Sequence, residues 1–393
     1  MLHKFTVNNF KSLINVTYEP GAVNLLTGVN NSGKTNLCQA LHFLSRAVQE
    51  RGTLFDAWQG VKGPGMIPVK NVYFDHPTVD LSCTCELIVD EEPLRFHYSL
   101  GLPAAPLGPL TVVAERLQTS GGPFGLGGVT LLENEDGQVR LLDEARYLDS
   151  EPLDACYLDT TTNVSTTMLS HLHDQQASRR ALAFRNYLNS WQYYDLEPHR
   201  LRDDRFDRQA VVLNSDGSAL ASVLFNLKNR DERRYRRLVE LAQKVEQRLD
   251  ALHFSFAGER IAMELIDAQG HPFGLSGASN GTLRFMALCY IILNNARQSN
   301  SPLAIIEEPE NGLYVRCLKP LFELIDPTGT GGQYIFTSHS PYFIDLFDTQ
   351  LENITLMEDR GTYSDLVKPD PAQMRKYLEE MPLGELHFRE MLA

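Results

Sequence analysis

The feature that most constrains this chain is a glycine-rich turn between an apolar run and a helical pattern. Residues 21–27 form the apolar run, and apolar side chains recur at helical spacing over residues 34–48. The turn between them fits the pattern G-x-x-x-x-G-K-[ST] and reads Gly28-Val29-Asn30-Asn31-Ser32-Gly33-Lys34-Thr35. A strand, a phosphate-binding loop and a helix are therefore predicted in direct succession.

The residue types in this turn suit a nucleotide. Glycines let the backbone curl so that N–H groups point at phosphate oxygens, and the helix N-terminus adds its positive end. We expect Lys34 to reach the β- and γ-phosphates and Thr35 to ligate Mg²⁺. ATP and Mg²⁺ are thus the predicted bound groups, and the predicted binding residues are Gly28, Asn30, Asn31, Ser32, Gly33, Lys34, Thr35 and Asn36.

Two more apolar strands are followed by chemically active side chains. Residues 303–306 lead into Glu307 and Glu308, and residues 334–337 are followed closely by His339. Ligands in an open α/β sheet lie at the carboxyl ends of strands. We expect Glu307 to hold Mg²⁺ through water and Glu308 to accept a proton from the attacking water. His339 would touch the γ-phosphate or that water, or else it is an ordinary structural histidine.

A small-residue turn precedes the acidic strand. Residues 277–284 read Gly-Ala-Ser-Asn-Gly-Thr-Leu-Arg and open a predicted helix. A turn of this kind at a helix N-terminus can bind an anion, and it can equally be an ordinary N-cap. Ser279 and Gly281 are the two candidate residues, and the sequence leaves both interpretations open.

Taken in this order, the four segments resemble the ABC-type ATPases of the SMC, RecF and OLD group. The resemblance covers residues 1–50 and 270–345, and it includes Asn9-Phe10-Lys11-Ser12. It implies an α/β fold: an ABC/SMC-type ATPase head with a mixed sheet, an antiparallel β-subdomain and an inserted helical lobe. It also implies that Ser279 and Gly281 bind the γ-phosphate held by a partner's phosphate loop, so that two copies form a homodimer.

Members of this group that look most similar are compact bacterial ATPases that work beside nucleases or toxins in DNA repair and antiphage defence. The resemblance therefore implies a dimeric ATPase that controls an effector protein or engages DNA. The alternatives are a scaffold that binds ATP without hydrolysing it, and a transporter subunit. Three departures from the group's pattern stand out: Glu307 replaces the usual Asp, the turn reads Ser-Asn-Gly-Thr, and no glutamine can be assigned to the Q-loop.

The remaining patterns predict how the chain is divided. Residues 79–89 and 94–102 alternate like paired strands joined by a turn at residues 90–93, and a second hairpin turns at residues 135–137. Residues 53–68 are predicted to be a loop. Residues 168–252 are helical in pattern and rich in arginine. We therefore expect a first half of the head over 1–165, an inserted helical lobe over 166–253 and a second half over 254–393.

Charge and composition limit the partners. A net charge of −14 argues against a protein that coats DNA with its whole surface. Arg230, Arg233, Arg234 and Arg237 would lie on one side of a helix, and nearby acids favour a solvated, ion-paired helix face over the alternative, a basic stripe that meets phosphates. The six scattered cysteines are expected to be reduced core thiols. With no signal peptide and no membrane span in sight, a cytoplasmic protein without a membrane partner is expected.

Overall fold

The computed structural model describes the chain apart from residues 51, 62–69, 72, 105–109, 150, 174–177, 275–278, 296–299, 301, 326–330, 390 and 393. Its contacts divide it into two units. The first unit comprises Met1–Gly21, Thr27–Trp191 and Thr355–Lys368, and the second comprises Ala22–Leu26, Gln192–Ile354 and Pro369–Ala393. The division at residues 165 and 253 stays a prediction.

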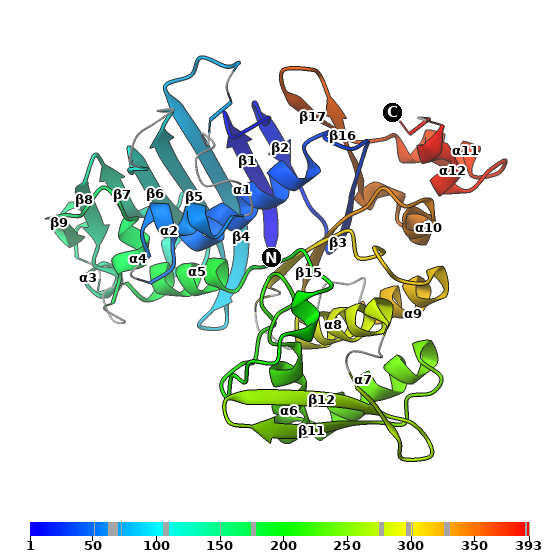
Figure 1. Ribbon diagram of the computed structural model, residues 1–393. Helices are drawn as coiled ribbons and strands as arrows, with labels where there is room; N and C mark the ends of the chain where they lie inside the picture. Colours follow the sequence, from blue (N-terminus) through cyan, green and yellow to red (C-terminus); the bar gives the residue numbers. More distant parts are fainter. Residues whose placement is uncertain are drawn as a thin grey trace. The chain divides into compact units, whose positions relative to one another are not determined.

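The first unit is built on an antiparallel sheet. Its eight strands are β1 (Leu2–Asn8), β2 (Val16–Tyr18), β4 (Thr78–Val89), β5 (Glu92–Pro103), β6 (Ala114–Ser120), β7 (Val129–Glu135), β8 (Gln138–Leu142) and β9 (Tyr157–Thr161). They lie in the order β2-β1-β4-β5-β6-β7-β8-β9 (Figure 1). Buried and more exposed residues alternate along β4, because one face of the sheet packs on the core. The predicted antiparallel β-subdomain is this sheet.

Both predicted hairpins are present in this sheet. Strands β4 and β5 pair over their whole length, and β7 and β8 flank the turn at residues 136–137. The first turn is shorter than predicted, because Asp90 and Glu91 both have positive φ angles, of 55° and 66°. Such a two-residue turn matches the natural twist of a hairpin. Glu92 therefore already belongs to β5.

Helices cover the sheet of the first unit. They are α1 (Lys34–Ala47), α2 (Leu54–Gln59), α3 (Glu144–Leu148), α4 (Met168–His171) and α5 (Arg179–Asn189), with short 3₁₀ turns η1 (Gly122–Phe124) and η2 (Leu153–Cys156). The unit is completed by the hairpin of β16 (Ile354–Asp359) and β17 (Ser364–Val367). Figure 1 shows α1, α2 and α5 on the same side of β4 and β5. The predicted helix over residues 34–48 is confirmed as α1.

The predicted loop over residues 53–68 is wrong in its first part. Helix α2 forms there because Thr53 and Asp56 cap it reciprocally: the Thr53 side chain accepts from the Asp56 N–H, and the Asp56 carboxylate accepts from the Thr53 N–H. Residues 62–69 lie outside the described part of the chain. The glycines and prolines of the segment thus obscured a short, well-capped helix.

The second unit contains a parallel sheet. Its strands are β3 (Val23–Thr27), β10 (Gln192–Tyr194), β14 (Leu303–Glu307) and β15 (Gln333–Thr337), and neighbours pair in the order β10-β14-β15-β3. Strands β3, β14 and β15 are buried at every position, as continuous apolar strands of a parallel sheet are. All three were predicted. Strand β10 was not, because it lies in a segment predicted to be helical.

A second, three-stranded sheet and a set of helices complete this unit. The sheet is formed by β11 (Ala251–Ala257), β12 (Arg260–Ile266) and β13 (Pro272–Gly274) in that order. Helix α8 carries the longest buried run of the unit. The helical elements are η3 (Arg200–Arg202), α6 (Leu220–Arg230), α7 (Glu232–Val245), α8 (Asn280–Asn295), η4 (Val315–Cys317), α9 (Leu318–Phe322), α10 (Pro341–Ile344), η5 (Asp345–Phe347), η6 (Leu351–Asn353), α11 (Pro371–Tyr377) and α12 (Leu383–Phe388).

The four arginines that could have formed one basic helix stripe lie on two helices. Asp231 ends α6 and caps α7, so Arg230 and the other three arginines belong to two different helices. Arg234 donates to Asp231 and to the Leu293 carbonyl, and Arg237 pairs with Glu240 at 3.5 Å. The ion-paired alternative therefore describes these residues better.

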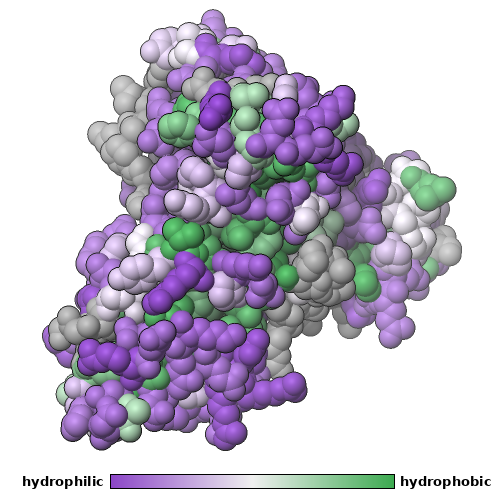
Figure 2. All heavy atoms as spheres, turned by 90° about the vertical axis from the view of Figure 1, so that its right-hand side faces the viewer, coloured by the Kyte–Doolittle hydropathy of each residue, from purple (hydrophilic) through white to green (hydrophobic). Residues whose placement is uncertain are grey.

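Other predictions about composition can be compared with the structure directly. All six cysteines are free and buried, as expected of reduced core thiols. Among the described helices, none is both long and apolar enough to cross a membrane. The face drawn in Figure 2 is covered mainly by hydrophilic side chains, with smaller hydrophobic areas between them.

Candidate functional site

The glycine-rich turn adopts a conformation that requires its glycines. Gly28 and Gly33 have φ angles of 140° and 103°, in a region that side chains with a Cβ rarely adopt. A Cβ on Gly28 would lie 2.2 Å from the Met357 carbonyl oxygen, and one on Gly33 would lie 2.3 Å from the Ser364 Oγ. The loop thus packs its backbone directly against the β16–β17 hairpin.

Polar groups of the turn are arranged as a phosphate cradle would need them. The Lys34 Nζ folds back and donates to the carbonyls of Gly28 at 2.8 Å and Val29 at 2.9 Å. The Ser32 Oγ is buried and has no hydrogen-bond partner among the described residues. Asn30, Asn31 and Thr35 are exposed. A buried hydroxyl without a partner is unusual, and a bound phosphate oxygen would satisfy it.

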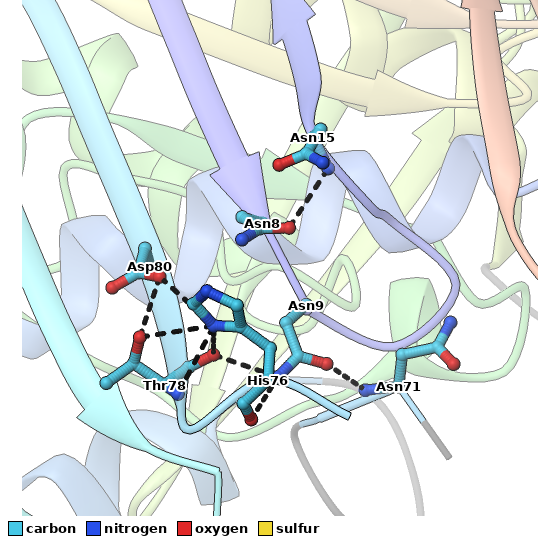
Figure 3. A network of polar contacts seen from close by, with 7 residues as sticks. All are labelled: Asn8, Asn9, Asn15, Asn71, His76, Thr78 and Asp80. Atoms are coloured by element: carbon cyan, nitrogen blue, oxygen red, sulfur yellow. Dashed lines mark hydrogen bonds and ion pairs between the residues drawn. The ribbon is translucent and has the colours of Figure 1, made fainter. Parts of the chain in front are cut away.

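The segment before this turn is tied down by amide side chains. Asn9 is fully buried with a φ of 59°, and its Nδ2 donates to the Thr78 carbonyl at 2.8 Å (Figure 3). The Asn71 N–H donates to the Asn9 Oδ1 at 3.1 Å (Figure 3). Ser12, three residues after Asn9, accepts a hydrogen bond from the Asn36 Nδ2 of α1 at 2.7 Å. Asn9 thus fixes the segment before the turn, and Ser12 braces the first turn of α1.

Replacing Gly28 by Ala tests how tightly the loop is built. We expect Gly28→Ala to lower the free energy of unfolding by about 1–3 kcal/mol, because a Cβ meets main chain and the φ angle is strained. Gly361→Ala is the matched control, since Gly361 also has a positive φ, of 84°, but has open space where its Cβ would lie. Thermal unfolding without nucleotide compares the two, and equal losses would contradict the tight packing.

The acidic pair lies at the carboxyl end of β14. Glu307 is the last residue of the strand and is 8% exposed, whereas Glu308 is half-buried. Glu308 has a φ of 43°, which is uncommon for a residue with a side chain. Its N–H donates to the Thr337 carbonyl at 3.0 Å, and Thr337 ends the neighbouring strand β15. The neighbouring strand thus supports the strained backbone.

The side chains of Glu308 and His339 meet. The His339 Nδ1 lies 3.3 Å from the Glu308 Oε1, and the Asn311 Nδ2 donates to the Glu308 Oε2. His339 and Glu308 retain side-chain exposures of 45% and 34%, so solvent reaches both. The structure therefore brings together Glu308, the base proposed from the sequence, and His339, which the sequence proposed to touch the γ-phosphate or the attacking water.

Strand register places the ends of three strands at one edge of the parallel sheet. Glu307 is opposite Thr337, and Thr337 is opposite Leu26 of β3. The Ser338 N–H donates to the Leu26 carbonyl at 3.1 Å. The acidic pair and His339 thus follow the ends of β14 and β15, and Gly28 comes two residues after Leu26 along the chain. This is the edge at which α/β sheets bind ligands.

Comparison with solved structures identifies this architecture. The crystal structure of an SMC head bound to the C-terminal winged-helix domain of ScpA aligns with 95% of this chain and 99% of its own, with 11% identity and a TM-score of 0.53. The chain has the fold of an ABC/SMC-type ATPase head. Other aligned heads are from Thermotoga maritima (12% identity, 94% of this chain and 99% of that one, TM-score 0.42) and Pyrococcus furiosus (12%, 96% and 98%, 0.46).

Sequence comparison covers part of the same head. Residues 156–345 match the family model described as "AAA domain, putative AbiEii toxin, Type IV TA system". The matched segment includes the acidic pair, His339 and the turn at residues 279–281, but it does not reach the glycine-rich loop. A search of curated protein sequences found no match.

The turn that opens α8 of the head is an N-cap in this structure. The Ser279 Oγ accepts from the Thr282 N–H at 3.0 Å, and a Cβ on Gly281 would lie 2.7 Å from the Gly312 carbonyl oxygen. Ser279 is exposed. The two preceding residues of the predicted turn, Gly277 and Ala278, lie outside the described part of the chain. The capping role is thus present, and a role toward a partner's phosphate remains a prediction.

Sequence reasoning missed an arginine of the head. Arg284 is 5% exposed; its Nη2 donates to the Glu308 carbonyl at 2.8 Å and its Nη1 to the Leu196 carbonyl at 2.7 Å. Burial lowers the pKa of its guanidinium. The Thr337 carbonyl accepts from the N–H of Glu308, and Arg284 donates to the carbonyl of Glu308. The two residues together hold the strained backbone of Glu308 from both ends. A lone charged residue in the apolar run of α8 was the signal for it.

A third acid, Glu310, supports the same edge. The Ser338 Oγ donates to the Glu310 Oε1 at 2.6 Å, and the second oxygen of Glu310 is buried without a partner among the described residues. Burial raises the pKa of Glu310, and the bond from Ser338 opposes this rise. Glu310 therefore connects the segment after β14 to the segment that carries His339.

Sequence reasoning also missed the partner of Glu307. The Tyr193 OH, from β10, donates to the Glu307 Oε1 at 3.0 Å, and Tyr193 is 5% exposed. Because β10 has three residues, its period is too short to detect in sequence. The consecutive residues Trp191, Gln192, Tyr193 and Tyr194 were the available signal, since aromatic residues favour strands.

Proposed function

We propose that this head binds ATP with Mg²⁺, hydrolyses it, and uses the ATP-bound state to form a homodimer. The observation that carries the proposal is the construction around Glu308. Its peptide is held in a strained conformation by Thr337 and Arg284, and its carboxylate meets His339. Strain of this kind is typically kept where a side chain must be aimed for function. The neighbouring β3 leads along the chain into the phosphate loop.

On the phosphate side, the chain supplies positive groups from the loop. The Lys34 ammonium now bonds two carbonyls of its own loop, and we propose that it exchanges them for the β- and γ-phosphates. The first N–H groups of α1 and the orphaned Ser32 hydroxyl would bind the remaining oxygens.

The residues proposed for the metal match its chemistry. Mg²⁺ prefers hard oxygen ligands, and the Thr35 hydroxyl and the Glu307 carboxylate are both of this kind. When bound, Mg²⁺ would neutralise charge on the β- and γ-phosphates. In this proposal Thr35 binds it directly and Glu307 holds it through water.

Glu308 and His339 would have different roles toward the attacking water. The Glu308 carboxylate would orient a water molecule and accept its proton, which is the role of a general base. His339, with its Nδ1 against Glu308, would orient that carboxylate and approach the γ-phosphate with its other ring nitrogen. Both side chains are partly exposed, so a water molecule can reach the Glu308 carboxylate from solvent.

A shared site would couple ATP to assembly. We propose that Ser279 and Gly281 of one copy contact the γ-phosphate held by the phosphate loop of the other copy. The SMC head of the aligned crystal structure is bound to a domain of ScpA, and the matched family model names a toxin. By analogy, the ATP-bound dimer of this chain would control a partner effector, a nuclease or toxin, or engage DNA, in antiphage defence or DNA repair.

Metal dependence is the most direct test of turnover. We expect the purified protein to release phosphate from ATP in the presence of Mg²⁺ and to stop when EDTA is added. A phosphate-release assay at fixed ATP measures this. ATP binding without any turnover in Mg²⁺ would instead favour the scaffold that binds ATP without hydrolysing it, and turnover that survives EDTA would contradict the metal site.

A further inference from the structure

Glu307, the acid at the end of β14 that replaces the usual Asp, accepts a hydrogen bond from Tyr193 on the neighbouring strand β10. We propose that Tyr193 is a positioning residue that aims Glu307 at Mg²⁺. This inference rests on the proposed function, since it assigns a helper to one of the proposed metal residues. Nothing in the sequence pattern of the ATPase group points to Tyr193; its role follows from the hydrogen bond to Glu307.

Strand geometry explains why these two side chains meet. Strand β10 runs parallel to β14, and Tyr193 is opposite Ile305. Side chains two residues apart in a strand share a face, so Ile305 and Glu307 point to the same side as Tyr193. The phenol ring is long enough to reach along the strand to the last residue of β14. Its OH thus donates to the Glu307 Oε1 at 3.0 Å.

The length of Glu307 explains why a positioning group is needed. Glutamate has one more methylene and one more rotatable bond than aspartate, so its carboxylate can take more positions unless something holds it. Glu307 is 8% exposed and Tyr193 5% exposed, so their hydrogen bond is protected from water. The Tyr193 OH, held in place by strand β10, fixes the position of the Glu307 Oε1 and thereby the orientation of the Glu307 carboxylate.

The chain offers a matched pair of variants for a test. Tyr193→Phe removes the OH and keeps the ring, and Tyr194→Phe makes the same change at the next residue of β10, which is 4% exposed and faces the other side. Calorimetry of ATP binding at increasing Mg²⁺ gives the Mg²⁺ concentration for half-maximal binding. We expect Tyr193→Phe to raise it about ten-fold, from the loss of one hydrogen bond to a charged group. Tyr194→Phe should leave it within two-fold.

A double variant shows whether the effect acts through Glu307. Glu307→Asp shortens the side chain by one methylene, which takes the carboxylate away from the phenol. In that background Tyr193→Phe should change the Mg²⁺ requirement by less than two-fold. An equal effect in both backgrounds would overturn the proposal, as would equal effects of Tyr193→Phe and Tyr194→Phe. ATP binding without Mg²⁺ should be the same in all variants, and a loss there would mean that Tyr193 serves the fold rather than the metal.

The two proposals fail differently. If the wild-type protein shows no Mg²⁺-dependent ATP binding, the proposed function fails and the role of Tyr193 fails with it. If wild-type binding depends on Mg²⁺ and Tyr193→Phe retains that dependence unchanged, the role of Tyr193 alone is refuted.

Discussion

Glu308→Gln is expected to lower the rate of ATP hydrolysis by about a hundred- to ten-thousand-fold while ATP still binds. The change removes the carboxylate that would take the proton from water, and it keeps the length and one acceptor oxygen of the side chain. The Thr337 and Arg284 bonds are made to the main chain, so they are unaffected. Single-turnover hydrolysis and calorimetric ATP binding measure the two quantities separately.

The matched control is an exposed carboxylate of the same unit. Glu323→Gln makes the same chemical change at an exposed residue remote in sequence from the acidic pair, and should hydrolyse ATP at the wild-type rate. If Glu308→Gln also hydrolyses at that rate, Glu308 is not the base. A variant that has lost ATP binding as well would point to a structural role for Glu308 instead.

The same variant tests the shared site. ATP that binds but is not consumed should accumulate between two copies, so light scattering of Glu308→Gln with ATP and Mg²⁺ should show a dimer. Adding Ser279→Arg places a bulky cation at the proposed contact and should return the protein to a monomer. Ser279 also caps α8, so Ser279→Arg is expected to lower the free energy of unfolding by about 1 kcal/mol. Thermal unfolding of the variants with and without Ser279→Arg, in the absence of nucleotide, measures this loss. A trapped dimer that survives Ser279→Arg would disprove the contact.

Lys34→Met should weaken ATP binding by at least about a hundred-fold. The substitution removes the charge that would neutralise the β- and γ-phosphates. The lost charge-assisted hydrogen bonds correspond to a binding free energy on the order of 3 kcal/mol. Methionine keeps most of the aliphatic chain of this buried residue, whereas Lys34→Ala would also leave a gap. The direct measurement is calorimetric titration with ATP in Mg²⁺.

An exposed lysine serves as the control for charge. Lys376→Met, on α11, removes one positive charge from the surface and should bind ATP as the wild type does. The phosphate-loop assignment would fail if Lys34→Met and Lys376→Met bound ATP equally well. Comparing Lys34→Met with Lys34→Ala then separates charge from packing.

Local patterns in the sequence were enough for most of the strands, for both hairpins and for the position of the candidate residues at the strand ends. Apolar and polar residues alternate over most of β4 and β5, and β14 and β15 each contain an uninterrupted apolar run, so each strand carries its own signal. The turn from Gly28 to Thr35 is recognisable because its conformation needs glycine at fixed spacing. Glu307, Glu308 and His339 were singled out because they lie at or just after the ends of such strands.

The tertiary structure alone decided the features that depend on partners distant in sequence. Strand β10 exists because β14 pairs with it, since three residues have too little propensity to form a strand unaided. Asp231 separates α6 from α7, and Arg234, which it holds, also donates to the Leu293 carbonyl 59 residues further along the chain. The strained peptide of Glu308 likewise depends on Arg284, which is 24 residues away in the chain. Sequence thus determined which side chains are present at the sheet edge, and only packing determined what holds them there.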